Sequence, residues 1–211
     1  MGGYRAVLRR IVETETQARI LDVGCGAGQW LAAAAEEGMG AVGIDTRVSE
    51  RALRERDRYG YGLVRSHAEK LPFRGGSFDV VLLELVLPYL NVERCLQEVA
   101  RVLKEKGRVH GACHGPAYYV SAAWNEALRL EATALRRAGV LVYTLLRRAA
   151  GLERYRFETF QTPRQMRRAL MGAGFGDVEV GLGGHPFDRR LGTAMLPMFF
   201  WFQARRRKAL S

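Results

Sequence analysis

The residues with the clearest chemical potential lie in the stretch 19–31, where a short apolar run is followed at once by three glycines. The run at residues 20–23 has the density of a strand that is buried on both faces. Residues 29–37 contain four consecutive alanines and no glycine or proline, which predicts a helix. Glycines let a backbone approach a ligand closely, and a helix N-terminus presents free N–H groups. The pattern therefore predicts a nucleotide-type cradle centred on Gly24, Gly26 and Gly28.

Two aspartates sharpen this prediction. Asp22 directly precedes the glycine turn, and Asp45 ends a second predicted strand in the sequence MGAVGID. A carboxylate at the end of strand two can accept both hydroxyls of a ribose in the crevice of a doubly wound sheet. The alternative is the dinucleotide-binding turn of a dehydrogenase, whose spacing is G-x-G-x-x-G. That alternative leaves Asp22 unexplained.

The motifs LDVGCGAGQW, VGID, HAEKLPF and FDVVLLE resemble those of the class I S-adenosylmethionine-dependent methyltransferases, especially the type 11 small-molecule group. The resemblance implies an α/β fold, with a Rossmann-like, doubly wound, mostly parallel seven-stranded sheet whose last strand is antiparallel. It also implies S-adenosylmethionine as cofactor and S-adenosylhomocysteine as product. The residues expected at the cofactor are Asp22, Gly24, Cys25, Gly26, Gly28, Gln29, Trp30, Asp45, Thr46, His67, Ala68, Glu69, Glu84 and Leu85.

One position departs from the family pattern. HAEKLPF resembles the segment that closes over adenine, where an acidic residue usually precedes the alanine, but here that position holds His67. A neutral histidine could accept the adenine amino hydrogen through one ring nitrogen, or its ring could stack on the base. A histidine of a surface loop is the other interpretation. The backbone N–H of Ala68 can serve the cofactor in either case.

The rest of the chain predicts the elements that position these residues. Helices are expected at residues 7–15, after the N-cap Ser49 as far as Arg58, after the N-cap Asn91, and from Pro163 to Gly172 behind a capping box. Further strands are expected at residues 62–66, 78–83, 108–113 and 174–180, with a turn at residues 105–106. The final apolar stretch PMFFWFQARR is expected as strand seven, with a membrane-touching anchor as the alternative.

Residues 117–160 do not continue the alternation of strands and helices of the nucleotide fold. They predict two helices, at 118–138 and 140–151. Family members commonly place a substrate-covering insertion at this point, so we expect one domain over residues 1–211 with a helical cap at 117–160. A helical pair on the sheet edge is the alternative. The aromatic residues that could wall an acceptor are Tyr118, Tyr119, Trp124 and Tyr155.

Methyl transfer requires alignment of the acceptor and exclusion of water more than acid-base machinery. Among the polar residues near strand ends, which include Glu84 and His110, we select His114 and Tyr89 as candidate catalytic and substrate residues, because His114 directly follows strand five. A structural histidine in a turn is the alternative. His110, Cys113 and His114 have no fourth partner at a recognisable spacing, so no metal site is expected.

The chain has 33 basic and 22 acidic residues, a formal net charge of +11. This charge favours acidic partners, or it reflects solvated helix faces and a basic tail. A small-molecule acceptor is the expected partner, and its identity and atom stay open. RNA methylation and non-catalytic cofactor binding are the alternatives, although ELVLPY stands where an RNA enzyme would carry a tetrad such as Asn-Pro-Pro-Tyr.

Three cysteines without a framework spacing, and no signal peptide, predict a cytoplasmic protein. The most apolar run, residues 195–202, is far shorter than the roughly 20 residues that span a bilayer. Peripheral contact with a membrane and the oligomeric state stay open.

Overall fold

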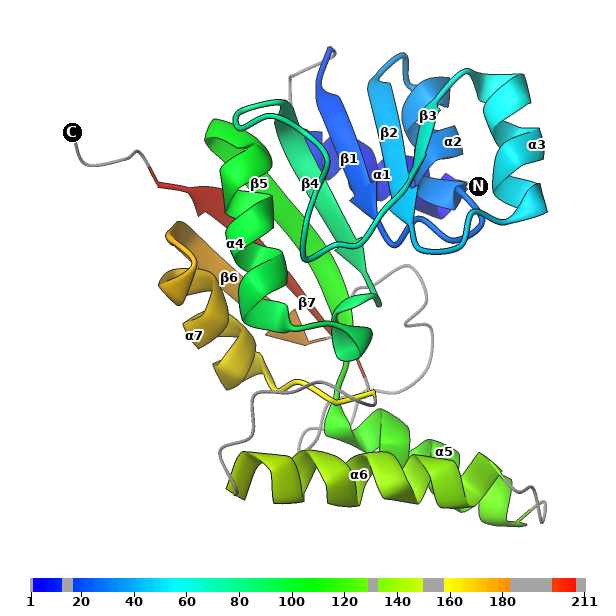
Figure 1. The fold of residues 1–211 in the computed structure, drawn as a ribbon, viewed down its shortest axis with the longest axis vertical. Helices are drawn as coiled ribbons and strands as arrows, with labels where there is room; N and C mark the ends of the chain where they lie inside the picture. Colours follow the sequence, from blue (N-terminus) through cyan, green and yellow to red (C-terminus); the bar gives the residue numbers. More distant parts are fainter. Residues whose placement is uncertain (1, 13–16, 129–132, 150–157, 183–198, 208–211) are drawn as a thin grey trace.

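A seven-stranded sheet forms the centre of the computed structural model, which describes residues 2–12, 17–128, 133–149, 158–182 and 199–207 (Figure 1). The strand order is β3-β2-β1-β4-β5-β7-β6, and β7 is antiparallel to both of its neighbours while β1 to β5 are parallel. This confirms the Rossmann-like, doubly wound sheet with an antiparallel last strand. The strands are β1 (Arg19–Val23), β2 (Gly40–Asp45), β3 (Gly62–Arg65), β4 (Phe78–Glu84), β5 (Leu103–His114), β6 (Phe175–Leu182) and β7 (Phe199–Arg206).

Helices cover both faces of this sheet (Figure 1). Apolar side chains of α4 and α7 form one buried cluster with one face of the sheet, and those of α1 and α2 form a second cluster with the other face. The strands between these layers are buried on both sides, as their apolar runs predict. The helices are α1 (Gly2–Val12), α2 (Gln29–Glu36), α3 (Glu50–Tyr59), the short 3₁₀ helix η1 (Leu87–Tyr89), α4 (Val92–Val102), α5 (Pro116–Leu128), α6 (Thr133–Ala149) and α7 (Pro163–Gly172).

The three expected N-caps are present. The side-chain oxygen of Ser49 accepts from Ala52 N at 3.1 Å, and Asn91 Oδ1 accepts from Arg94 N at 3.0 Å. Thr162 and Gln165 form the reciprocal capping box at the start of α7. These local signals fix where α3, α4 and α7 begin, because each satisfies a backbone N–H that the helix itself cannot.

Three expectations about boundaries were wrong. The predicted helix break at Gly139 does not occur, since α6 runs through this residue from Thr133 to Ala149. A single glycine costs a helix only about 1 kcal/mol, which tertiary packing overrides. The predicted turn at residues 105–106 is instead part of β5, which starts at Leu103 and absorbs a register shift against β4 where Lys106 has a φ of 62°. The first helix also starts earlier than expected, at Gly2.

Helices α5 and α6 lie side by side at the end of the sheet where β4 and β5 terminate (Figure 1). Helix α5 begins two residues after His114, the last residue of β5. The chain returns to the sheet at Thr159, whose backbone N–H donates to Pro88 O of η1 at 2.8 Å. The pair is therefore attached at the carboxyl edge of the central strands, where open α/β sheets bind ligands.

Candidate active site

The glycine turn after β1 is tied to β2 through its backbone. Gly24 N and Cys25 N both donate to Ile44 O, at 2.8 and 3.0 Å. All three glycines of the turn have positive φ, namely 76° at Gly24, 52° at Gly26 and 80° at Gly28. Side chains rarely adopt this conformation, so glycine is needed at each position. Cys25 itself is buried, which raises the pKa of its thiol, and it serves the turn through its backbone.

The glycines differ in what surrounds them. A Cβ on Gly24 would overlap the side chain of Val86, and one on Gly28 would overlap the hydroxyl of Tyr61. A Cβ on Gly26 would meet no protein atom within 4 Å, the turn backbone included. Gly26 therefore borders open space, which is the side from which a ligand can approach the turn. Gly28 also leaves the N-terminus of α2 without a side-chain cap, as an anion-binding helix end requires.

Asp45 ends β2 directly beside this turn. Its Oδ2 accepts from Gly26 N at 3.0 Å, and its Oδ1 accepts from Arg47 N at 3.0 Å. A carboxylate oxygen can accept more than one hydrogen bond, so both oxygens keep capacity for ligand hydroxyls. The residue that was expected to hold a ribose thus also holds the turn. Thr46, its neighbour, is exposed and accepts from Arg65 Nε through its carbonyl oxygen.

Asp22 is the most unusual group in the site. It is 1% exposed, and neither carboxylate oxygen has a hydrogen-bond partner within the described part of the chain. Burial first, and then the charges of Glu84 and Asp45, raise the pKa of Asp22 from 3.8 to about 8. A buried carboxyl without partners costs folding free energy. It fits a site whose positive charge arrives with a ligand, and S-adenosylmethionine carries both an ammonium and a sulfonium group.

Helix α1 contributes Tyr4 to the surroundings of Glu84 and Asp22. The pKa of Tyr4 is raised by burial and then by Glu84 and Asp22, which places its phenol near both carboxylates. Its ring packs edge-on against Trp30 with centroids 4.8 Å apart. Trp30 was expected at the cofactor, but it is buried in the core between α1 and α2, with Gln29 exposed beside it. Sequence reasoning missed Tyr4, because no motif marks it.

The backbone at the end of β4 is held in an uncommon conformation. Leu85 has a φ of 59°, and its N–H donates to Ala112 O at 2.9 Å. Non-glycine residues with positive φ persist only where the surroundings enforce them, and they cluster at binding sites. Glu84 precedes it, with its Oε1 3.9 Å from Nε2 of His110. Glu84 and Leu85, both expected at the cofactor, therefore lie at a strand end next to the glycine turn, where the following residue, Val86, lies against Gly24.

The loop of His67, Ala68 and Glu69 follows β3 and starts at Ser66, whose N–H donates to Asp45 O at 3.0 Å. His67 is exposed, so it can face a ligand through its ring. Ala68 is buried, so it can face a ligand only through its backbone. Glu69 has a structural partner, since its Oε1 accepts from Asn91 N at 2.6 Å, at the start of α4. Its second carboxylate oxygen keeps capacity for the predicted cofactor contact.

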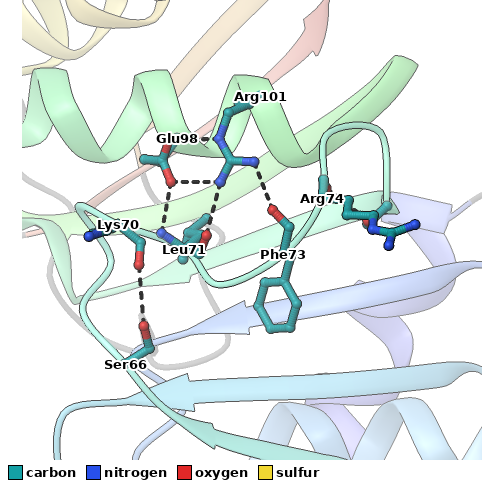
Figure 2. Close-up of polar contacts among 8 residues, drawn as sticks. Ser66, Lys70, Leu71, Phe73, Arg74, Glu98 and Arg101 are labelled. Carbon is teal, nitrogen blue, oxygen red and sulfur yellow. Dashed lines mark hydrogen bonds and ion pairs between the residues drawn. The ribbon is translucent and has the colours of Figure 1, made fainter.

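A pair of charges on α4 fixes the continuation of this loop (Figure 2). Arg101 donates to Phe73 O at 2.7 Å and to Leu71 O at 2.9 Å. Glu98 accepts from Leu71 N at 2.8 Å and from Arg101 Nε at 2.7 Å. The two side chains satisfy the loop backbone on both its donor and acceptor sides. They therefore position the segment that the sequence places over the cofactor.

Aromatic rings gather where β5 ends. The ring of His114 stacks on Tyr118 with centroids 4.0 Å apart, and Tyr119 and Phe199 also contact the histidine ring. Glu84 of β4 pairs with Ala112 of β5. His114 is two residues after Ala112, so it lies about 7 Å further along the strand than Glu84 does. The structure thus brings three predicted substrate residues together beside the strand ends.

A buried carboxylate lies beneath these rings. Glu158 Oε1 accepts from the Tyr119 hydroxyl at 2.7 Å and lies 3.7 Å from the guanidinium of Arg137. That guanidinium stands over the ring of Tyr118, 5.4 Å from its centroid. Burial and then the Glu158 charge raise the pKa of Tyr89, which brings this candidate into the same group. Sequence reasoning missed Glu158, because it follows the helices without any motif.

Trp124 is not part of this cluster. Its side chain is 68% exposed, because it lies five residues after the inward-facing Tyr119 and so about 140° around α5. Tyr155, also proposed to wall the acceptor, lies outside the described residues.

Across the described residues, no group of three or more His, Cys, Asp or Glu could hold a metal ion. None of the helices described has the length and apolarity that crossing a membrane requires.

Part of the chain is similar to known methyltransferases. A family model described as a methyltransferase domain matches residues 21–110. An uncharacterized protein of Methanocaldococcus jannaschii is 36% identical over 106 residues, which is 49% of this chain and 40% of that protein. A demethylmenaquinone methyltransferase of Lactococcus lactis is 32% identical over 118 residues, 50% of this chain and 46% of the enzyme. The chain thus spans less than half the length of these curated relatives.

The fold extends the likeness over almost the whole chain. A phosphoethanolamine N-methyltransferase of Haemonchus contortus, solved with S-adenosyl-L-methionine, superposes with a TM-score of 0.69 at 16% identity. The match covers 98% of this chain and 53% of that enzyme. At this identity the likeness concerns the fold, whereas the family model matches residues 21–110, which include the glycine turn.

Proposed function

Because residues 21–110 form a class I methyltransferase domain of the type 11 group, we propose that the protein transfers the methyl group of S-adenosylmethionine to a small-molecule acceptor. The observation that carries the proposal is Asp22, a carboxyl buried without a partner directly before a glycine turn. A cationic cofactor supplies the missing charge, and the open side of Gly26 supplies the approach.

Each strand end has a part in holding the cofactor. Asp22 and Glu84 offer carboxylates to its cationic end, while the uncapped N-terminus of α2 offers N–H groups to a carboxylate. Asp45 offers the acceptor capacity that two ribose hydroxyls require. The loop at residues 67–69 lies beyond Asp45, where the adenine would extend.

The bound cofactor supplies an activated methyl group, so the protein has to align the acceptor and exclude water. We assign this task to the cap, residues 117–160, together with the aromatic cluster at the end of β5. We assign to His114 the acceptance of the proton that a hydroxyl or amine acceptor releases, and to Tyr89, whose raised pKa keeps its phenol protonated, a hydrogen bond that holds the acceptor. Tyr118 and Tyr119 provide an apolar wall. The names of the relatives, among them demethylmenaquinone methyltransferase, support a small-molecule acceptor.

Calorimetry tests the cofactor half of the proposal. We expect binding of S-adenosylmethionine and S-adenosylhomocysteine, with both affinities lowered about 10- to 100-fold in Asp22→Asn. Preference for NAD over both ligands would overturn the proposal. Transfer of a radioactive methyl group to an extract then tests the acceptor class, with label expected in the small-molecule fraction. Label confined to RNA would assign the alternative acceptor, and no label at all would leave a cofactor-binding protein.

A further inference from the structure

The helical pair α5–α6 carries most of the exposed apolar side chains of the described chain. Ten large apolar or aromatic side chains are exposed among all the described residues, and six of these ten belong to the two helices. The other four are scattered over α3, η1, α7 and β6, as is normal for a protein surface. Those of the pair are Val120, Trp124, Leu135, Val142, Leu145 and Leu146. Such a concentration marks an interaction surface.

Helix α6 is apolar on two opposite sides. Its inner side buries Val140 and Thr144. Its outer side presents Leu135, Val142 and Leu146, which are 81%, 55% and 64% exposed. These three residues are seven and four positions apart, so they lie on one face of the helix. We call them, with Leu145, the outer face of α6. A helix that is apolar on both sides is normally covered on both.

The charge of the helix indicates what covers this face. The sequence of α6 contains four arginines and no acidic residue, and the chain as a whole has a net charge of +11. One of the four, Arg137, is paired with Glu158. Two copies of the chain that met through this face would bring two arginine-rich helices together, which like-charge repulsion opposes. An anionic surface satisfies both the apolar face and the positive charge.

We propose that the outer face of α6 docks on the surface of an anionic lipid membrane. The helix lies in the plane of the surface, with its leucines and valine among the acyl chains and its arginine-rich sequence near the phosphates. Its length of 17 residues and four arginines exclude a spanning arrangement. The exposed Val120 and Trp124 of the neighbouring α5 extend the apolar area of the pair.

Flotation of the full chain with vesicles tests this surface. We expect the protein to float with vesicles of equal parts phosphatidylcholine and phosphatidylglycerol, to stay behind with phosphatidylcholine alone, and to be released as salt rises. The double variant Val142→Glu with Leu146→Glu should lower the vesicle partition coefficient about 100-fold or more, because two apolar side chains no longer enter the acyl region. Both positions are exposed, so the variant should keep the thermal unfolding temperature and the S-adenosylhomocysteine binding of the parent.

The matched control is Met171→Glu on α7, an apolar side chain with a similar exposure of 52%. It adds a negative charge as well, and it should leave vesicle binding nearly unchanged. Equal flotation of the parent and the double variant would overturn the proposal, as would absence of binding to both kinds of vesicle. A dimer that ignores vesicles and dissociates in the double variant would assign the face to a second copy and overturn it too. None of these results depends on methyl transfer, so the proposed function can fail separately.

Discussion

The strand-end region and the helical pair α5–α6 are held in place in different ways. Around the cofactor site, the bonds end on the backbone: Gly24 N and Cys25 N donate to Ile44 O, the Asp45 carboxylate accepts from Gly26 N, and the Arg101 guanidinium donates to Phe73 O. Within the described part of the chain, the pair has such a bond from Thr159 N to Pro88 O and is otherwise held mainly by contacts between side chains, such as the stack of His114 on Tyr118 and the bond of Tyr119 to Glu158. A bond that ends on the backbone keeps that partner when the side chain at the position changes, whereas a contact between two side chains does not. The cofactor site can therefore stay constant while the acceptor region changes.

Replacing Asp22 should affect the strand-end region most. Asp22→Asn keeps the shape but removes the charge, so cofactor affinity should fall about 10- to 100-fold with the loss of a charged partner. The unfolding free energy at neutral pH should rise by a few kcal/mol, since one pKa unit corresponds to about 1.4 kcal/mol and the variant has no buried acid to ionise. Calorimetry and urea unfolding measure the two effects. A variant that loses stability and keeps its affinity would show that Asp22 has a structural role alone.

The same residue predicts a dependence on pH. The pKa of Asp22 in the folded protein, about 8, lies above its ordinary value of 3.8, so the folded state holds this proton more tightly than the unfolded state does. Its contribution to the unfolding free energy is full below pH 3.8 and decreases as the pH rises toward 8. Affinity for a cationic ligand runs in the opposite direction and should rise up to about tenfold per pH unit below pH 8. Both slopes should disappear in Asp22→Asn.

A pair of glycine variants separates ligand contact from backbone strain. Gly26 and Gly38 both have positive φ, 52° and 74°, and a Cβ on either would meet no protein atom within 4 Å. Alanine at each should cost about 1 kcal/mol of unfolding free energy. Only Gly26→Ala places its methyl group where the cofactor approaches, so it alone should weaken binding, by about tenfold or more. Equal cofactor binding by the two variants would show that the ligand does not contact the glycine turn.

The sequence predicts the strand-end region well because its signals are local. Ser49, Asn91 and Thr162 cap the helices that they were expected to cap, and the apolar runs before Asp22 and Glu84 are buried strands. The sequence says less about where the side chains there point. Trp30 adjoins the turn in sequence but points into the core, and Glu69 bonds to Asn91, because a motif specifies the backbone path and not each rotamer.

The helical pair was predicted less completely, since its contacts join residues distant in the sequence. Tyr119 and Glu158 are 39 positions apart, and nothing in the residues around Glu158 indicates that it is buried. Gly139 indicated a break that the packing of α6 overrides. Trp124 was grouped with Tyr118 by composition, whereas the turn of α5 separates them. The helical content could be predicted, but the direction in which each face points could not.

Removing one hydroxyl should affect the pair without touching the cofactor site. Tyr119→Phe deletes the 2.7 Å bond to Glu158 and leaves a buried carboxylate short of a donor, at a cost of about 1 to 3 kcal/mol of unfolding free energy. The rate of methyl transfer should fall about tenfold through misalignment of the acceptor, with cofactor affinity unchanged. Tyr59→Phe is the matched control, because it deletes an exposed bond from tyrosine to Glu36 at 3.0 Å and should change neither quantity. Loss of cofactor binding in Tyr119→Phe would contradict the division between the two regions.

The smallest effect is expected from the clamp on the loop at residues 71–73. Arg101→Lys keeps the charge but cannot reach Leu71 O, Phe73 O and Glu98 with one planar group. The clamp is partly exposed, so the unfolding free energy should fall by only about 0.5 to 1.5 kcal/mol. Amide exchange in the loop should quicken, and cofactor affinity should weaken a few-fold, because a loosened loop must be ordered again on binding. Arg94→Lys, at an exposed position of the same helix, should leave the exchange and the affinity as they are. If exchange quickens while affinity stays constant, Arg101 orders the loop without contributing to cofactor binding. The hydrogen bonds that support cofactor binding then extend no further than Asp45.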